Sequence, residues 1–155
     1  TFVTKKITIA AAKISKGMQK KLYLGNLNAK RDWGDARDFV EGMWKILQHP
    51  KPDDFVLATG KSFTVRRFAE LAFKEVNINI RWRGKGLNEV GYNSSNKKTI
   101  IEIDKRYFRP NEVDFLQGNY AKSKKLLDWK PKITLNQMIK DMIARTSGED
   151  AVDDF

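Results

Sequence analysis

Residues 55–76 read FVLATGKSFTVRRFAELAFKEV, and this stretch decides the fold class. Its first four residues are apolar and end at Thr59-Gly60, which is typical of a short buried strand followed by a turn. From Thr64 onward, apolar residues recur at helical spacing, so we predict a helix that begins at this threonine. A strand, a turn and a helix in this order indicate an α/β domain.

Further helices and strands are expected on the amino-terminal side of this stretch. A helix should begin near Thr4 and stop at Gly17, and a strand should follow at residues 22–24. A second helix follows Asp35 and ends at the prolines within 50–52. The apolar residues of this second helix share one face: Phe39, Val40, Met43, Trp44 and Leu47.

The carboxy-terminal side continues the pattern. The expected elements are a strand at 78–82, a strand at 99–103, a helix at 119–127 and a helix at 134–143. Residues 84–98 are rich in Gly, Asn and Ser, so we expect a loop or a mobile lid there. The last helix opens with a Thr134/Gln137 capping box. Helices dominate, which describes a small α/β domain with a minor sheet.

The length of 155 residues, 41% of them apolar, suits one compact core and is too short for two ordinary domains. We place the domain at residues 1–147 and assign the acidic residues 148–155 to a frayed tail. Cysteine is absent and no long apolar run precedes the first charged segment. A reducing, cytoplasmic compartment is therefore expected, with no membrane span.

The net charge of +11, with a pI near 9.8, favours polyanionic partners such as phosphates or nucleic acid. The basic residues are spread along the chain in pairs, which argues against a disordered basic tail. A surface for nucleic acid would need exposed aromatic residues among the basic ones. Trp33, Trp44 and Phe68 occupy positions better explained by packing or by the sequence motifs described below, so nucleic acid is not the expected partner.

The sequence argues against several kinds of catalytic site. One histidine, His49, and no cysteine leave no zinc cluster and no histidine-activated nucleophile, so no metal is expected. Asp35 and Asp38 are placed to stabilise a helix amino terminus rather than to act as an acid and base pair. Tyr120 and Lys124 have the spacing of a short-chain dehydrogenase catalytic pair, but that spacing is common by chance.

The motif RDWG at residues 31–34 lies just ahead of a helix. The planar guanidinium of Arg31 suits a phosphate, and the nearby helix amino terminus adds attraction for an anion. A surface ion pair between Arg31 and Asp32 or Asp35 explains the same residues equally well.

The motif YFRPNE at residues 107–112 has a similar character. Arg109 could face a phosphate while Glu112 accepts hydrogen bonds from vicinal hydroxyls, with Pro110 stiffening the turn. The alternative is a turn at a strand end with an internal ion pair.

Six segments in a fixed order carry a resemblance to a known family. They are TFVTxKIT at 1–8, LYLGN at 22–26, RDWG at 31–34, ATG at 58–60, YFRPxEV at 107–113 and LDWKP at 127–131. Together they resemble the GDP-mannose 4,6-dehydratases, within the extended short-chain dehydrogenase/reductases, over roughly residues 1 to 145. The resemblance implies a helix-rich carboxy-terminal substrate domain, with the Rossmann half absent from this chain.

The resemblance also implies a site for the guanine of GDP-mannose. It implies that Lys6 and the backbone of Val3 contact the base and that Leu24 packs against it. A lysine donor suits the O6 and N7 acceptors of guanine and would meet an amino group on adenine. Position 5 is Lys where the family usually has Arg, which puts any contact carried over to that position in doubt.

For the rest of the ligand, the resemblance implies that Arg31 binds the diphosphate and that Arg109 and Glu112 hold phosphate and ribose. Two arginines would offset a diphosphate charge of about minus two.

The activity implied is that of an NADP-dependent lyase. In the complete enzyme, C4 of mannose is oxidised, water is eliminated across C5 and C6, and hydride returns to C6, which makes GDP-4-keto-6-deoxymannose for GDP-fucose biosynthesis. The family's NADP-binding turn and catalytic Tyr and Lys lie upstream of this chain, so we expect no catalytic residue here and no activity alone. The expected partners are an amino-terminal Rossmann half and further copies in a dimer or tetramer. The alternative is a non-enzymatic relic that acts as an interaction subunit through its basic surface.

Overall fold

The computed structural model describes residues 2–108 and 113–149. The chain divides into two compact units: unit 1 comprises residues 1–29, 64–112 and 139–155, and unit 2 comprises 30–63 and 113–138. One core was expected from the length, but each unit gathers apolar residues of its own. The two units are described separately below.

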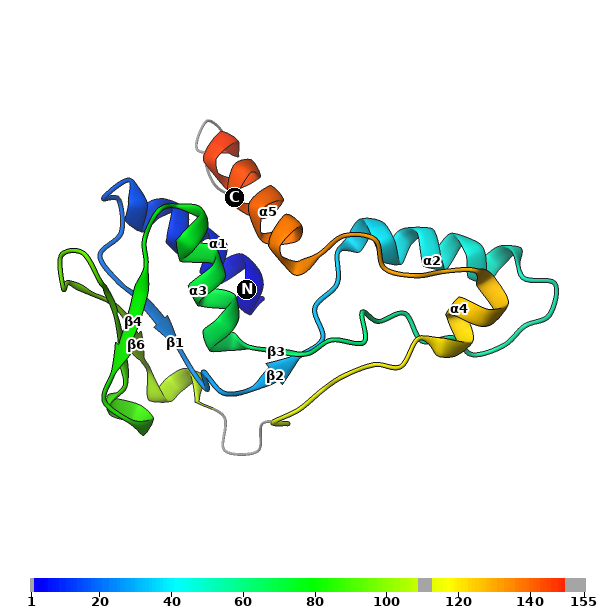
Figure 1. Ribbon diagram of the computed structural model, residues 1–155, viewed down its shortest axis with the longest axis horizontal. Coiled ribbons are helices and arrows are strands. Elements are labelled where there is room, and N and C mark those ends of the chain that lie inside the picture. The colour runs from blue at the N-terminus through cyan, green and yellow to red at the C-terminus, as the bar shows by residue number, and fades with distance from the viewer. Residues whose placement is uncertain (1, 109–112, 150–155) are drawn as a thin grey trace. The chain divides into compact units, whose positions relative to one another are not determined.

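The elements follow one another as helices and short strands (Figure 1). They are α1 (Val3–Ser15), β1 (Leu22–Leu24), β2 (Lys30–Arg31), α2 (Ala36–Gln48), β3 (Phe63–Thr64), α3 (Val65–Glu75), β4 (Ile80–Arg83), η1 (Gly86–Asn88), β5 (Val90–Asn93), β6 (Thr99–Ile103), η2 (Lys105–Tyr107), α4 (Ala121–Leu127) and α5 (Leu135–Glu149), where η marks a 3₁₀ turn.

Unit 1 contains a four-stranded mixed sheet with the strand order β1-β6-β5-β4. Strands β1 and β6 are parallel, with Leu22 opposite Ile101, and the other neighbours are antiparallel. Leu22, Leu24 and Ile101 are at most 2% exposed, so one side of the sheet belongs to the core. The predicted α/β class with a minor sheet is confirmed.

Helices α1 and α3 pack against each other in unit 1 (Figure 1). The predicted cap of α3 is confirmed, because Thr64 Oγ1 accepts a hydrogen bond from the N–H of Arg67 at 3.0 Å. Gly17, at φ +75°, ends α1 as predicted, since the N–H of Met18 can then donate to the carbonyl of Lys13. Thr4 is not the cap of α1, because the helix already begins at Val3.

The expected loop at 84–98 is wrong in part, since it contains strand β5 between β4 and β6. The strand was missed because Gly91 interrupts the apolar alternation. A Cβ at this position would lie 3.0 Å from the Trp82 ring and 3.1 Å from Ile101 Cβ. Gly91 therefore permits close packing within a segment whose Gly, Asn and Ser content suggested a loop.

Unit 2 is organised around Trp129, which is 1% exposed. Its ring lies 6.2 Å from the Phe39 ring and 5.9 Å from the Tyr120 ring, and its Nε1 donates to the carbonyl of Asp38 at 2.8 Å. The predicted strand at 55–58 is not formed. One of its carbonyls, that of Val56, accepts a hydrogen bond from the Ser123 hydroxyl at 2.6 Å instead of from a neighbouring strand.

Helix α2 begins after Asp35 as predicted, with the Asp35 carboxylate accepting from the N–H of Arg37. The expectation that Trp44 packs in a core is wrong, because it is 61% exposed. Val40, Met43 and Leu47 on the same face are also exposed, at 62%, 56% and 81%. We call these four residues the α2 stripe.

Helix α5 opens at the predicted capping box, where Thr134 Oγ1 accepts from the N–H of Gln137 at 3.2 Å. It runs to Glu149, so the first two residues of the expected tail 148–155 are helical, and 150–155 lie outside the described residues. Of the helices that the structure describes, none is long and apolar enough to span a membrane.

Candidate functional site

The first turn of α1, the end of β1 and the η2 turn meet in unit 1. The Asp104 N–H donates to the carbonyl of Leu24 at 2.9 Å, which continues the β1–β6 pairing toward η2. The ammonium of Lys6 lies 3.5 Å from the centroid of the Tyr107 ring, a close cation–π contact. A Cβ at Gly25 would overlap the Tyr107 carbonyl oxygen, so this approach requires glycine.

Three charged side chains lie around this meeting point: Asp104, Arg106 and Lys6. The side-chain hydrogen bond from Arg106 is the largest cause that lowers the pKa of Asp104, followed by the Arg106 N–H and then by the charges of Arg106 and Lys6. Asp104 is thus already engaged by Arg106 at 2.7 Å. No hydrogen bond of the Lys6 ammonium is recorded among residues 2–108 and 113–149, so its N–H groups that do not face the Tyr107 ring can donate to a polar ligand.

Val3 is the first residue of α1 and is half-buried. The preceding residue, Phe2, is extended and makes no side-chain cap hydrogen bond. The first N–H groups of a helix have no acceptor within it, so the Val3 backbone is a donor available to a ligand. Leu24 is only 2% exposed, which leaves little of its side chain for a base to contact.

Arg31 lies in unit 2, on strand β2. Its Nη1 donates to the carbonyls of Lys30 and Val113, at 2.8 and 2.6 Å. The guanidinium therefore lies beside the residue that follows the YFRPNE motif in the chain. Arg109 and Glu112 of that motif lie outside the described residues.

The acid of the RDWG motif has a structural role that the sequence did not reveal. The Asp32 carboxylate accepts hydrogen bonds from the N–H groups of Thr59 and Gly60, both at 2.9 Å, and of Gly118 at 3.1 Å. It holds three chain segments of unit 2 together. The only signal in the sequence was its position next to a predicted phosphate-binding arginine.

The other polar candidates also have structural roles. Asp38, which is 4% exposed, lies in the first turn of α2 as predicted, and its carboxylate also accepts from the N–H groups of Lys132 and Ile133 at 2.9 Å. His49 is a turn residue at the end of α2, as predicted, and its Nδ1 lies 2.7 Å from the carbonyl of Lys51. Tyr120 packs edge-on against Trp129 in unit 2.

Among the described residues, Gly84 and Gly86 do not form the turn that a dinucleotide cofactor requires. Its pyrophosphate needs a glycine-rich turn between a strand and the amino terminus of a helix. The Gly-x-Gly pair of this chain, Gly84 and Gly86, lies instead in the β4–β5 connection, ahead of a single 3₁₀ turn. Among residues 2–108 and 113–149, no group of three His, Cys, Asp or Glu side chains could hold a metal ion.

The comparison with solved structures gives the fold first. RMD from Pseudomonas aeruginosa, complexed with NADPH, has a TM-score of 0.76 at 19% identity, over 96% of this chain and 43% of that one. A dTDP-glucose 4,6-dehydratase from Bacillus anthracis, in complex with NAD, has a TM-score of 0.68 at 16% identity, over 94% and 40%. The chain therefore shares its α/β fold with parts of these two proteins.

The sequence comparison then gives the family. The model described as GDP-mannose 4,6 dehydratase matches residues 1–142. GDP-mannose 4,6 dehydratase of Dictyostelium discoideum is 52% identical over 145 residues, which cover 94% of this chain and 41% of that protein. The human protein of that name is 46% identical over 142 residues, covering 92% and 38%. The chain therefore belongs to the GDP-mannose 4,6-dehydratase family, and it spans about two fifths of the length of these relatives.

Proposed function

We propose that this chain is the carboxy-terminal, GDP-mannose-binding portion of a GDP-mannose 4,6-dehydratase. The observation that carries the proposal is the family match over residues 1–142, combined with the cluster of Lys6, Leu24 and η2 in unit 1. The complete enzyme would convert GDP-mannose to GDP-4-keto-6-deoxymannose with NADP. This portion would supply binding and orientation, which contribute a large share of a rate by positioning.

Guanine recognition is assigned to the start of α1. Lys6 would donate to O6 and N7 of the base, with the backbone of Val3 beside it. The ring of Tyr107 restricts Lys6 to one region of space, so less side-chain freedom is lost when the base binds. Arg31 and Arg109 would bind phosphate and Glu112 the ribose, as the family resemblance implies.

The catalytic and NADP-binding residues are assigned to an amino-terminal Rossmann half that this chain does not contain. The α2 stripe supports this assignment, because four large apolar side chains in the i, i+3, i+4, i+7 pattern rarely stay exposed in a finished protein. The chain covers 41% of the Dictyostelium relative, so most of a full enzyme is available to cover the stripe. The alternative is that a second copy of this chain covers the α2 stripe. A dimer of the isolated chain in solution would favour the second copy, and a monomer would favour the Rossmann half.

Calorimetric titration of the purified chain with GDP-mannose, GDP and ADP at two salt concentrations tests the binding role. We expect guanine-selective binding and no turnover by the chain alone. Lys6→Ala should weaken GDP binding about tenfold, because it removes the donors to guanine. Lys5→Ala removes the same charge from the exposed neighbouring position and is the matched control.

Arg31 needs two variants, because its guanidinium also binds the Val113 carbonyl. Arg31→Lys keeps the charge and should weaken binding less than Arg31→Ala. Binding that ignores the base and falls equally in the Lys5 and Lys6 variants would overturn the proposal. It would favour the alternative of a non-enzymatic interaction subunit with a basic surface.

A further inference from the structure

A cavity of about 580 Å³ lies in unit 1, at the opposite end of α1 from Lys6. It is formed where α1 ends, where the chain enters β1, and at the turn between β5 and β6. Ile14 at its edge is eight residues beyond Lys6, which places it about 12 Å farther along the helix axis. The volume falls in the range of pockets that bind small molecules.

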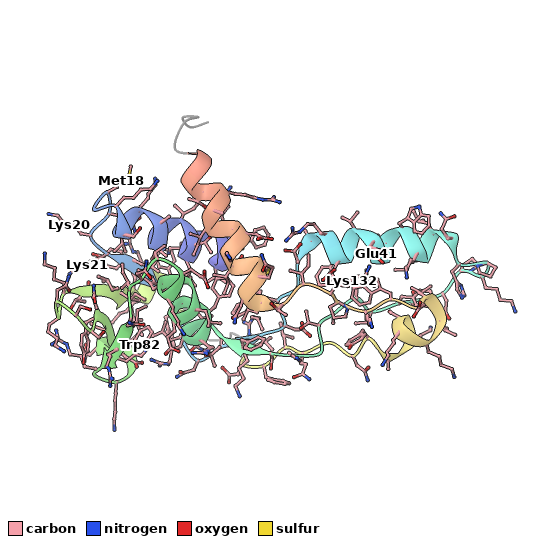
Figure 2. The ribbon with its side chains drawn as sticks, turned by 45° about the horizontal axis from the view of Figure 1, so that its top comes forward. Met18, Lys20, Lys21, Glu41, Trp82 and Lys132 are labelled. Carbon is pink, nitrogen blue, oxygen red and sulfur yellow. The ribbon has the colours of Figure 1, made fainter. Side chains whose placement is uncertain are left out.

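The charged residues that line this cavity are all positive. Lys20, Lys21 and Lys98 belong to its wall, and none of the described residues that line it is acidic. Lys21 is paired with Glu102, at 2.5 Å between Nζ and Oε1. For Lys20 and Lys98 the structure records no ion pair within residues 2–108 and 113–149. Figure 2 shows Lys20 and Lys21 in the segment that leaves α1 past Met18.

Two asparagines add neutral donors to this wall. Asn93 Oδ1 accepts from the N–H of Ser95 at 2.9 Å, and Asn96 Oδ1 accepts from the N–H of Lys98 at 3.0 Å. Their acceptor oxygens are thereby used in the turn, and their NH₂ groups remain as donors. The turn is further fixed by the hydrogen bond from the Asn93 N–H to the Lys98 carbonyl at 2.9 Å.

Helix carboxyl ends usually disfavour an anion, and at the end of α1 two of the carbonyls that would face it are already hydrogen-bonded. The carbonyls of Lys13 and Ile14 are already bonded to the N–H groups of Met18 and Gly17, at 2.9 and 3.1 Å. The first 29 residues of the chain also contain six lysines and no aspartate or glutamate. The charged side chains of this segment are therefore all positive, which favours a negatively charged ligand.

We propose that this cavity binds a small phosphorylated metabolite, with its phosphate held by Lys20, Lys98 and the two asparagine NH₂ groups. An organic phosphate fits better than a bare anion, because the cavity is larger than a phosphate group and is also lined by Ile14, Ile78 and Ile100. The site is separate in the chain from the residues assigned to GDP-mannose, so the two proposals can fail independently.

The test is a ¹H–¹⁵N NMR titration of the full chain at constant ionic strength, with no nucleotide present, because the phosphates of GDP would compete for the cavity. Glucose 6-phosphate, inorganic phosphate and glucose are the three probes. We expect glucose 6-phosphate to shift the side-chain NH₂ signals of Asn93 and Asn96, inorganic phosphate to shift them with weaker affinity, and glucose to leave them unchanged.

Variants separate a built site from general attraction to a basic protein. Lys20→Ala combined with Lys98→Ala should weaken glucose 6-phosphate binding about tenfold. Lys74→Ala combined with Lys85→Ala removes the same charge from exposed positions of unit 1 that do not line the cavity, and should change binding less than about twofold. Asn96→Asp keeps the oxygen that accepts from Lys98 but replaces the donor with negative charge, so it should also weaken binding.

Three results would overturn the proposal: no shift at the asparagines with either phosphate, equal weakening in both lysine pairs, or unchanged binding in Asn96→Asp. Loss of binding together with loss of dispersed signals would indicate unfolding, and Asn96→Asp, which preserves the turn, then decides the matter.

Discussion

Helices α2 and α3 have the same amphipathic pattern but opposite surroundings. On α3 the apolar face is buried, with Phe68 and Phe73 at 0% exposure. On α2 the apolar face is exposed, with Trp44 at 61% and Leu47 at 81%. The side of α2 that unit 2 buries carries Asp38 and Gly42 instead. Amphipathic spacing thus predicts that a segment is helical. It does not predict which face of that helix will be buried.

The largest expected effect tests this contrast directly. Phe68→Ala should lower the free energy of unfolding by about 3–5 kcal/mol, because it empties a buried site. Trp44→Ala should change it by less than about 0.5 kcal/mol in this chain, since the side chain is exposed. Urea unfolding monitored by circular dichroism measures both. Similar losses in the two variants would mean that α2 is covered in solution.

The next effect concerns the polar anchor of α2. Asp38→Ala should destabilise unit 2 by about 2–3 kcal/mol, because it leaves the N–H groups of Lys132 and Ile133 without their carboxylate. Asp54→Ala, at an exposed position, is the control and should have little effect. Thermal unfolding of the two variants checks the difference. If Asp38→Ala were as stable as the control, α2 would have to be held by other contacts.

Gly42→Ala should change the free energy of unfolding by a smaller amount, and whether it rises or falls is informative. Alanine is favoured over glycine in a helix by about 1 kcal/mol. A Cβ here, however, would lie 2.7 Å from both Leu57 methyl carbons and 2.9 Å from Trp129 Nε1. We expect Gly42→Ala to lower the free energy of unfolding by about 1 kcal/mol, since the rigid indole cannot move aside cheaply. A stabilised variant in urea titration would show that this contact is loose.

The smallest effect lies on the exposed side of unit 2, where Lys132 pairs with Glu41 of α2 at 2.6 Å (Figure 2). The hydrogen bond from Lys132 is the largest cause that lowers the pKa of Glu41 below its ordinary value of 4.5. A lowered carboxyl pKa means that the pair contributes above about pH 4.5 and loses its contribution as the pH falls through the folded-state pKa. Lys132→Ala should raise the pKa of Glu41, with little change in stability because both groups are exposed. Carboxyl ¹³C NMR over a pH series measures it, and an unchanged pKa would mean that the pair does not form in solution.

Local sequence predicted most of the helices. Thr64, Asp35 and Thr134 each start a helix where expected, because capping is a short-range interaction between neighbours in the chain. The strand at 55–58 and the loop at 84–98 were predicted wrongly because strand formation depends on a pairing partner. Residues 90–93 find partners in β4 and β6, the strands just before and after them in the chain, whereas residues 55–58 find none among the described residues.

The candidate site was predictable in part. The motif order pointed to Lys6 and to the YFRPNE segment, and the structure brings Lys6 and Tyr107 of that segment together. The anchoring roles of Asp32 and Asp38 were not predictable, because their hydrogen-bond donors lie 27 to 95 residues away in the chain. The ligand-binding roles of the six predicted residues stay predictions: Val3, Lys6, Leu24, Arg31, Arg109 and Glu112.

The sequence by itself determined the α/β class, most helix boundaries and the family, because all of these depend on short motifs and on spacing along the chain. Only the tertiary structure decided that the chain forms two units, that β5 completes the sheet, and that α2 buries the side carrying Asp38 and Gly42. The physical reason is that packing joins residues far apart in sequence. The role of a buried carboxylate, or of a glycine at a close contact, is set by these distant neighbours.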